Sequence, residues 1–234
     1  MARRWLQWPP STGGDASAGK PWDYGQTMSE YFEIHPVTPQ QRLLAAAADV
    51  LRQGGVIVYP TDSTYALGCR IGEKTALERI RAIRRLDEKH NFTLACLDLS
   101  DIATYAKVNN QTYRLLKAYT PGPYTFILQA TREVPRMLQH PKRKTIGIRV
   151  PEHTISRALL AQLGEPLMTT SLLMPGEELP LTDPEDIREL LGKQVDLIIA
   201  AGNCGIEAST MVDLSGDEPK VLRRGLGDAD VFED

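Results

Sequence analysis

The chain has 234 residues, of which 42% are hydrophobic and 24% charged, and its formal net charge is −3. This globular composition excludes collagen-like, coiled-coil and wholly disordered chains, and the length allows one or two domains. The negative charge weighs against nucleic-acid binding by bulk attraction, and no apolar run approaches the roughly 18 residues that a membrane helix needs.

The cysteines and histidines are scattered. Cys69, Cys96 and Cys204 form no CxxC pair, which predicts neither a zinc site nor a disulfide framework. No two histidines have metal-ligand spacing, so we expect each of the four to be a surface residue and expect no metal site built by the protein. No apolar stretch follows the twin arginine near the N-terminus, which argues against a secretory signal. We therefore expect a cytoplasmic protein with reduced, mostly buried thiols.

The first segment differs in composition from the rest. All three tryptophans lie within the first 22 residues, in a stretch rich in proline, glycine and serine without helix or strand periodicity. We interpret residues 1–27 as a disordered extension and residues 28–234 as one domain. Met28 opens a more regular stretch, and one hypothesis is that the natural chain starts there.

Short β-branched segments alternate with helical ones along the remaining chain. Thr38-Pro39 predicts a helix start, and Thr182 with Glu185 has capping-box spacing for a later helix. The expected helices span residues 43–51, 76–86, 100–106, 110–119, 134–139, 154–163 and 182–191. The expected strands span residues 56–59, 91–97, 124–130, 145–150, 167–171, 195–200, 210–214 and 221–223. This alternation predicts a single α/β domain with a twisted open mixed sheet and helices on both faces.

Polar residues follow the first predicted strand. Thr61, Asp62, Ser63 and Thr64 offer three hydroxyls, a carboxylate and, if a helix begins there, its N-terminal amides. This arrangement suits a small polar or anionic ligand, whereas a plain capping turn explains it equally well.

Two further motifs carry candidate ligand groups. Residues 121–125 (PGPYT) predict a rigid turn before Thr125. Arg149 shares a strand face with Thr145 and Gly147, so its guanidinium stands opposite the apolar face, where a carboxylate or phosphate could reach it. An ordinary exposed strand face is the alternative.

Basic residues gather at two places. Arg81, Arg84 and Arg85 share one helix face, which suits phosphates but is also typical of a solvated surface. The second group, Lys142 to Lys144, is expected in a solvated loop. The sequence has no Walker loop, no GxGxxG motif and no GxSxG motif, so no nucleophile or catalytic residue is indicated.

In this order, the motifs resemble the YrdC/YciO-like family, the family of threonylcarbamoyl-AMP synthases. The matching stretches are residues 60–68, 121–125, 147–151, 209–213 and 223–225, within a resemblance over roughly residues 40–228. Residues 90–94 and 142–147 resemble the YciO-like branch. The resemblance implies a twisted open α/β sheet with a basic concave face. It also implies a reaction in which threonine, bicarbonate and ATP give threonylcarbamoyl-AMP and pyrophosphate for tRNA adenosine modification.

The resemblance also implies roles for individual residues. Threonine would be bound by Thr61, Thr64, Tyr65, Thr125 and Arg149. The nucleotide would be bound by Arg85, Ser171, Ser209 and Arg223, with Mg²⁺ accompanying ATP. Double-stranded or structured RNA is a further candidate partner, since members of the fold have been described as binding it. Its phosphates would meet Arg81, Arg84, Lys142, Arg143 and Lys144.

The chain departs from the synthase pattern at two positions. Asp87 stands where the synthases' Lys-x-Arg motif has its arginine, and Leu173 stands where their Ser-x-Asn motif has its asparagine. Losing a phosphate-binding cation is expected to weaken ATP binding. Three hypotheses therefore stay open: a synthase, a paralogue that binds structured RNA, and an enzyme that reuses the threonine pocket for another reaction.

Overall fold

The computed structural model describes residues 28–87, 90 and 92–233, so the predictions made for residues 1–27 lie outside the described residues. The helices are α1 (Gln41–Arg52), α2 (Lys74–Arg84), α3 (Leu99–Tyr105), α4 (Asn110–Tyr119), α5 (Thr154–Leu163), α6 (Pro184–Leu191) and a short 3₁₀ turn (Asp230–Phe232). The strands are β1 (Glu30–Glu33), β2 (Ile57–Pro60), β3 (Tyr65–Arg70), β4 (Thr93–Ala95), β5 (Tyr124–Gln129), β6 (Thr145–Arg149), β7 (Leu167–Ser171), β8 (Leu197–Ala200), β9 (Thr210–Asp213) and β10 (Lys220–Arg223).

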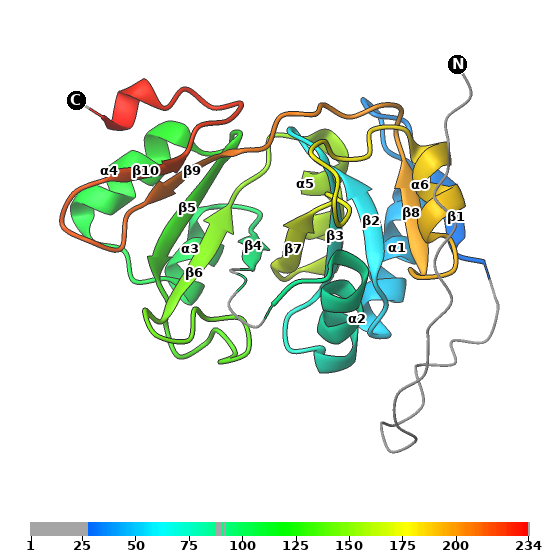
Figure 1. Ribbon diagram of the computed structural model, residues 1–234, viewed down its shortest axis with the longest axis horizontal. Coiled ribbons are helices and arrows are strands. Elements are labelled where there is room, and N and C mark those ends of the chain that lie inside the picture. The colour runs from blue at the N-terminus through cyan, green and yellow to red at the C-terminus, as the bar shows by residue number, and fades with distance from the viewer. Residues whose placement is uncertain (1–27, 88–89, 91, 234) are drawn as a thin grey trace.

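All of these strands join one sheet, in the order β1-β8-β2-β3-β7-β4-β6-β5-β9-β10 (Figure 1). Strand β8 pairs in parallel with both β1 and β2, and the pairs β4–β6 and β5–β9 are also parallel. The other pairs are antiparallel. The predicted mixed open sheet is thus confirmed. Strands β8 and β9, adjacent in the chain, enter the sheet far apart, so the segment between them crosses the molecule (Figure 1).

Strand alternation divides the core into two layers. In β2, Ile57 and Tyr59 face α1 and α5, while Val58 faces the opposite cluster that includes residues of α2, α3, α4 and α6. Helix α1 buries Leu44, Ala47, Ala48 and Leu51 at helical spacing, and α5 packs directly beside it. Helices therefore cover both faces of the sheet, as predicted.

Several local predictions were wrong. No helix follows the polar residues after β2, because Tyr65 to Gly68 pair antiparallel with β2 and form a hairpin. The predicted helix at residues 134–139 is a series of turns. Its amide donors bond to carbonyls three residues earlier, as Leu138 does to Pro135, so the i to i−4 bonds of an α-helix are missing.

Two helix caps also differ from the prediction. The backbone amides of Val37 and Thr38 donate to the His35 ring at 3.3 and 3.1 Å, so the chain turns there and α1 begins later, after Gln40. At α6, Asp183 rather than Thr182 is the N-cap, and its carboxylate accepts the Glu185 amide at 2.8 Å.

Candidate functional site

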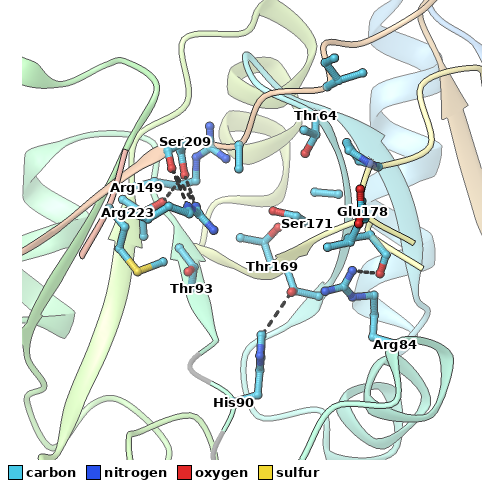
Figure 2. Close-up of a pocket in the computed structure, with 18 residues that line it drawn as sticks. Thr64, Arg84, His90, Thr93, Arg149, Thr169, Ser171, Glu178, Ser209 and Arg223 are labelled. Carbon is cyan, nitrogen blue, oxygen red and sulfur yellow. Dashed lines mark hydrogen bonds between the residues drawn. The ribbon is translucent and has the colours of Figure 1, made fainter. Parts of the chain in front are cut away.

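A cavity of about 200 Å³ opens over the middle of the sheet (Figure 2). Strands β3, β4, β5, β6, β7, β9 and β10 all contribute to its lining, together with the end of α2 and four connecting segments. Its lining includes Thr64, Arg84, His90, Thr93, Thr125, Arg149, Thr169, Thr170, Ser171, Leu173, Glu178, Ser209 and Arg223. Residues from distant parts of the chain therefore line the same cavity.

Three guanidinium groups converge on this cavity. Burial lowers the pKa of Arg84, and burial together with the nearby charge of Arg149 lowers the pKa of Arg223. Arg84 and Arg223 have backbone carbonyl partners, and neither forms an ion pair with a carboxylate among residues 28–87, 90 and 92–233. Because a concentrated positive charge is costly to desolvate, this arrangement favours an anionic ligand.

Arg149 is held from one side by the β2–β3 turn. It is 7% exposed, forms an ion pair with Asp62 and donates to the Ser63 hydroxyl at 3.3 Å. Its Nε–H is buried without a partner among the described residues. An unsatisfied buried donor at a cavity wall is what a ligand acceptor would complete.

Gly147 allows β6 to pack closely against β4. A Cβ added to Gly147 would lie 2.7 Å from the Thr93 hydroxyl, so a larger residue would push into this wall. As the strand period of two predicts, Arg149 and Gly147 share one face of β6, and the buried Ile146 and Ile148 lie on the other face.

A second corner combines Thr125, Ser209 and Arg223. The hydroxyls of Thr125 and Ser209 lie 2.8 Å apart, joining β5 to the start of β9. Arg223 Nη2 donates to the Ser209 carbonyl at 2.8 Å, and its Nε donates to the same oxygen at 3.2 Å. This backbone anchor fixes the guanidinium at the cavity without neutralising its charge.

The third corner lies at the end of α2. Arg84 donates to the backbone carbonyl of Leu173, which ties α2 to the loop after β7 (Figure 2). His90 Nε2 lies 3.4 Å from the Thr170 hydroxyl, and burial followed by the Arg84 charge lowers the His90 pKa. The Glu178 carboxylate belongs to the same side of the lining.

The structure brings together most of the residues selected from the sequence. Those in the cavity lining are Thr64, Thr125, Arg149, Ser171, Ser209, Arg223 and, from the basic helix, Arg84. Arg85 does not line it: this residue ends α2 in the left-handed conformation with φ of 49° and is exposed. Asp87 is also exposed and outside the lining.

Thr61 and Tyr65 support the site without lining it. The Thr61 hydroxyl donates to the Thr64 carbonyl at 2.6 Å and accepts the Ser63 and Thr64 amides, closing the turn. The Tyr65 hydroxyl donates to the Gly202 carbonyl at 2.7 Å, which fastens the segment crossing from β8 to β9.

The basic residues expected to meet RNA do not form one free surface. Arg81 pairs with Glu78 and stacks over Phe92, and Arg143 pairs with Asp213. Lys142 and Lys144 are exposed in the loop before β6, as predicted. These two ion pairs reduce the positive charge available to RNA phosphates, and RNA binding at these residues stays a prediction.

Sequence reasoning missed several lining residues. The prediction of surface histidines was wrong for His90, which lines the cavity, and for His153, which is half-buried at the start of α5. Thr93 and Thr169 are opposed in the β4–β7 pairing, a register that the sequence does not state. The sequence signal that could have identified Thr169 is its position next to the apolar Met168, because neighbouring strand residues point to opposite faces of a sheet.

Within residues 28–87, 90 and 92–233, no group of three or more His, Cys, Asp or Glu side chains could hold a metal ion. The same part of the chain contains no helix long and apolar enough to cross a membrane.

Comparison with known proteins identifies the family. A family model described as "Telomere recombination", for Sua5, YciO and YrdC proteins, matches residues 49–225. The protein YciO of Escherichia coli K12 is 56% identical over 205 residues, covering 88% of this chain and all of YciO. A threonylcarbamoyl-AMP synthase of Halorhodospira halophila is 31% identical over 82% of this chain and 99% of the synthase, which links the family to an enzyme activity.

Solved structures agree with this assignment. The crystal structure of E. coli YciO has a TM-score of 0.85 at 56% identity and covers 88% of this chain and all of that one. P. abyssi Sua5, solved in complex with L-threonine, shares the fold with a TM-score of 0.78 at 24% identity, covering 84% of this chain and 58% of that one. The chain belongs to the Sua5/YciO/YrdC family, in its YciO-like branch.

Proposed function

We propose that the cavity binds threonine together with an adenine nucleotide and that the chain carries out a threonylcarbamoyl-AMP synthase reaction. The amine of threonine and bicarbonate form a carbamate with loss of water. A carbamate oxygen then forms the bond to the α-phosphorus of ATP, and pyrophosphate leaves. The similarity to the named synthase supports this reaction over other uses of the same fold.

The observation that carries the proposal is the convergence of Arg84, Arg149 and Arg223 on one cavity. Arg149, with its unpartnered Nε–H, and the hydroxyls of Thr64 and Thr125 suit an amino-acid carboxylate. Arg223 and Arg84 retain charge that phosphate oxygens would neutralise. The two ligand ends would then lie side by side, as a joint reaction requires.

The proposed chemistry needs positioning and charge stabilisation more than a nucleophile. As the carbamate attacks, negative charge moves onto the departing pyrophosphate, and fixed guanidinium groups stabilise that charge without reorganising. Arg223 is fixed through the Ser209 carbonyl and Arg84 through the Leu173 carbonyl, so both cations are held in place in advance.

One lining residue could help to hold the Mg²⁺ ion expected with ATP. Mg²⁺ is commonly held by one or two carboxylates together with substrate phosphates, and it would supply further charge neutralisation at the nucleotide. Glu178 provides one carboxylate at the cavity.

The two departures from the synthase pattern have different consequences. Asp87 lies outside the cavity lining, so its carboxylate is not in the position of a phosphate-binding arginine. Leu173 does line the cavity and offers an apolar side chain where the synthases have an amide. We therefore expect leucine at position 173 to weaken nucleotide binding relative to the synthases. Arg84, at the end of α2, would supply a cation in place of the arginine that Asp87 replaces.

The test is release of pyrophosphate from ATP by the purified full chain, measured with threonine and bicarbonate present and with each omitted in turn. The expected result is release that requires both. Leu173→Asn is expected to increase the rate by restoring an amide at the nucleotide end. Binding of threonine and ATP is measured in parallel by calorimetry.

The outcomes separate the open hypotheses. Binding of threonine and ATP without pyrophosphate release would leave a binding site but reject the synthase reaction. Absence of threonine binding would reject the proposal altogether, and salt-sensitive binding of duplex RNA in the same preparation would favour the RNA-binding alternative.

A further inference from the structure

We propose that Asp62 is a positioning residue that fixes the direction in which Arg149 meets its ligand. Its functional consequence rests on the proposed function, because it concerns the carboxylate end of the same cavity. Asp62 pairs with Arg149 but is absent from the cavity lining, so it holds the guanidinium from behind.

The ion pair is buried on both sides. The side chains of Arg149 and Asp62 are 8% and 9% exposed. The second oxygen of Asp62 accepts the backbone amide of Glu152 at 3.2 Å, just beyond the end of β6. Because both carboxylate oxygens have partners, Asp62 joins the β2–β3 turn to the chain leaving β6 and is itself firmly held.

The other donors of Arg149 are constrained as well. Nη2 is used by Asp62, and Nη1 donates to Ser63, whose hydroxyl lies 3.2 Å from that of Thr61. Each of these terminal nitrogens carries a second N–H, and the Nε–H is buried without a partner among the described residues. The turn thus fixes one N–H on each terminal nitrogen and so orients the N–H groups that remain for a ligand.

A competing role for Asp62 would be to occupy Arg149 in place of the ligand. Its position behind the guanidinium and its bond to Glu152 argue against this role, because release would break two interactions of a buried carboxylate. The two roles predict opposite results when the carboxylate is removed: positioning predicts weaker ligand binding, and competition predicts tighter binding.

The test compares Asp62→Asn with Asp213→Asn in the full chain. Asp213 is a matched control, because it is 8% exposed and pairs with Arg143 away from the cavity. We expect Asp62→Asn to weaken threonine binding about tenfold or more. We expect its ATP dissociation constant to stay within about twofold, since Arg84 and Arg223 keep their own anchors. Asp213→Asn is expected to lower the melting temperature without changing the dissociation constant of threonine or of ATP.

Arg149→Gln and the double variant with Asp62→Asn complete a cycle. If Asp62 acts through Arg149, the double variant binds threonine no worse than Arg149→Gln alone. Ser63→Ala is a milder perturbation of the same support and serves if Asp62→Asn does not fold. Unchanged threonine binding in both Asp62→Asn and Ser63→Ala, or equal weakening of threonine and ATP, would overturn the inference.

A readout without ligand keeps the inference separate from the proposed function. In protein labelled with ¹⁵N-arginine, the Arg149 guanidinium signals, assigned by their loss in Arg149→Gln, should show restricted rotation that disappears in Asp62→Asn. The Asp213→Asn control should alter Arg143 instead. Unchanged Arg149 signals would reject positioning by Asp62, whereas altered signals without threonine binding in the parent chain would reject only the proposed function.

Discussion

At the scale of single residues, His90 has an unusual place for an imidazole. It lies between the Thr170 hydroxyl and the edge of Phe92, at a cavity that also contains Arg84. Burial is the main cause of its lowered pKa, and Arg84 and Arg81 lower it further, while Asp87 opposes them. The ring is therefore neutral at pH 7, and protonation would add a fourth positive charge to the cavity region.

This pKa predicts a stability change with pH. The folded chain binds the His90 proton less readily than the unfolded chain, whose histidine has a pKa of 6.5. The free energy of unfolding should then decrease as the pH falls below about 6.5 and level off below the folded-state pKa. Between about pH 7.5 and 5.5, the free energy of unfolding, measured in urea, should therefore fall less for His90→Gln than for the parent chain. An equal fall in both proteins would contradict this prediction.

Arg84 and Arg85 offer a second residue-scale prediction. They are neighbours in sequence, but Arg84 lines the cavity whereas Arg85 is exposed at the helix end. Arg84→Gln should weaken ATP binding about tenfold, because a partly desolvated cation at a phosphate site is lost. Arg85→Gln should change it less than about threefold. Calorimetric titration with ATP distinguishes them, and equal effects would refute the assignment.

At the scale of elements, the sequence predicted the strongly periodic segments well. Helix α5 and strand β7 have the predicted bounds, since an amphipathic helix and a β-branched strand each carry their own period. The hairpin at β3 was missed because Thr61 to Thr64 were interpreted as a ligand-binding or capping turn before a helix, and no strand was predicted after them. Its pairing with β2 on one side and β7 on the other shows that this run is a strand.

The candidate site was predictable only in part. Arg149 and Thr125 could be selected because each occupies a distinctive position on a strand, and the resemblance added Ser209 and Arg223. That Arg84 rather than Arg85 reaches the cavity depends on the residue at which α2 ends, and helix ends are poorly determined by local sequence. His90 had no local signal, because its burial comes from strands distant in sequence.

The cap of α6 provides an element-scale prediction. The Asp183 carboxylate accepts the Glu185 amide and satisfies a donor that has no partner within the helix. Asp183→Ala should reduce the free energy of unfolding by about 1 kcal/mol. Thr182→Ala, at the position that the sequence pattern favoured, should change it by less than about 0.5 kcal/mol. Urea unfolding measures both, and a larger loss at Thr182 would show that the cap is misplaced.

At the scale of the whole molecule, the cavity depends on strands that span most of the sheet. Its lining comes from seven strands between β3 and β10, which are contributed by residues 66 to 223. A partly assembled sheet would lack one or more of the three guanidiniums. Ligand binding and overall folding are therefore expected to be tightly linked.

This linkage is testable by unfolding in urea. Loss of the circular-dichroism signal and loss of ATP binding should share one midpoint, because the lining strands span the sheet from β3 to β10. Saturating ATP, at about 100 times its dissociation constant, should add about 2.7 kcal/mol to the free energy of unfolding. Binding that disappears at clearly lower urea would mean that the β9–β10 edge unfolds separately.

The strand order also bears on how the protein becomes active during its synthesis. Strand β9 must insert beside β5, which precedes it by some eighty residues, and β10 can pair only after β9 is in place. A nascent chain that has released residues through β8 can already form both helix-covered layers around β2, yet it lacks Ser209 and Arg223. The proposed nucleotide binding therefore requires that the segment from residue 209 to residue 223 has joined the sheet.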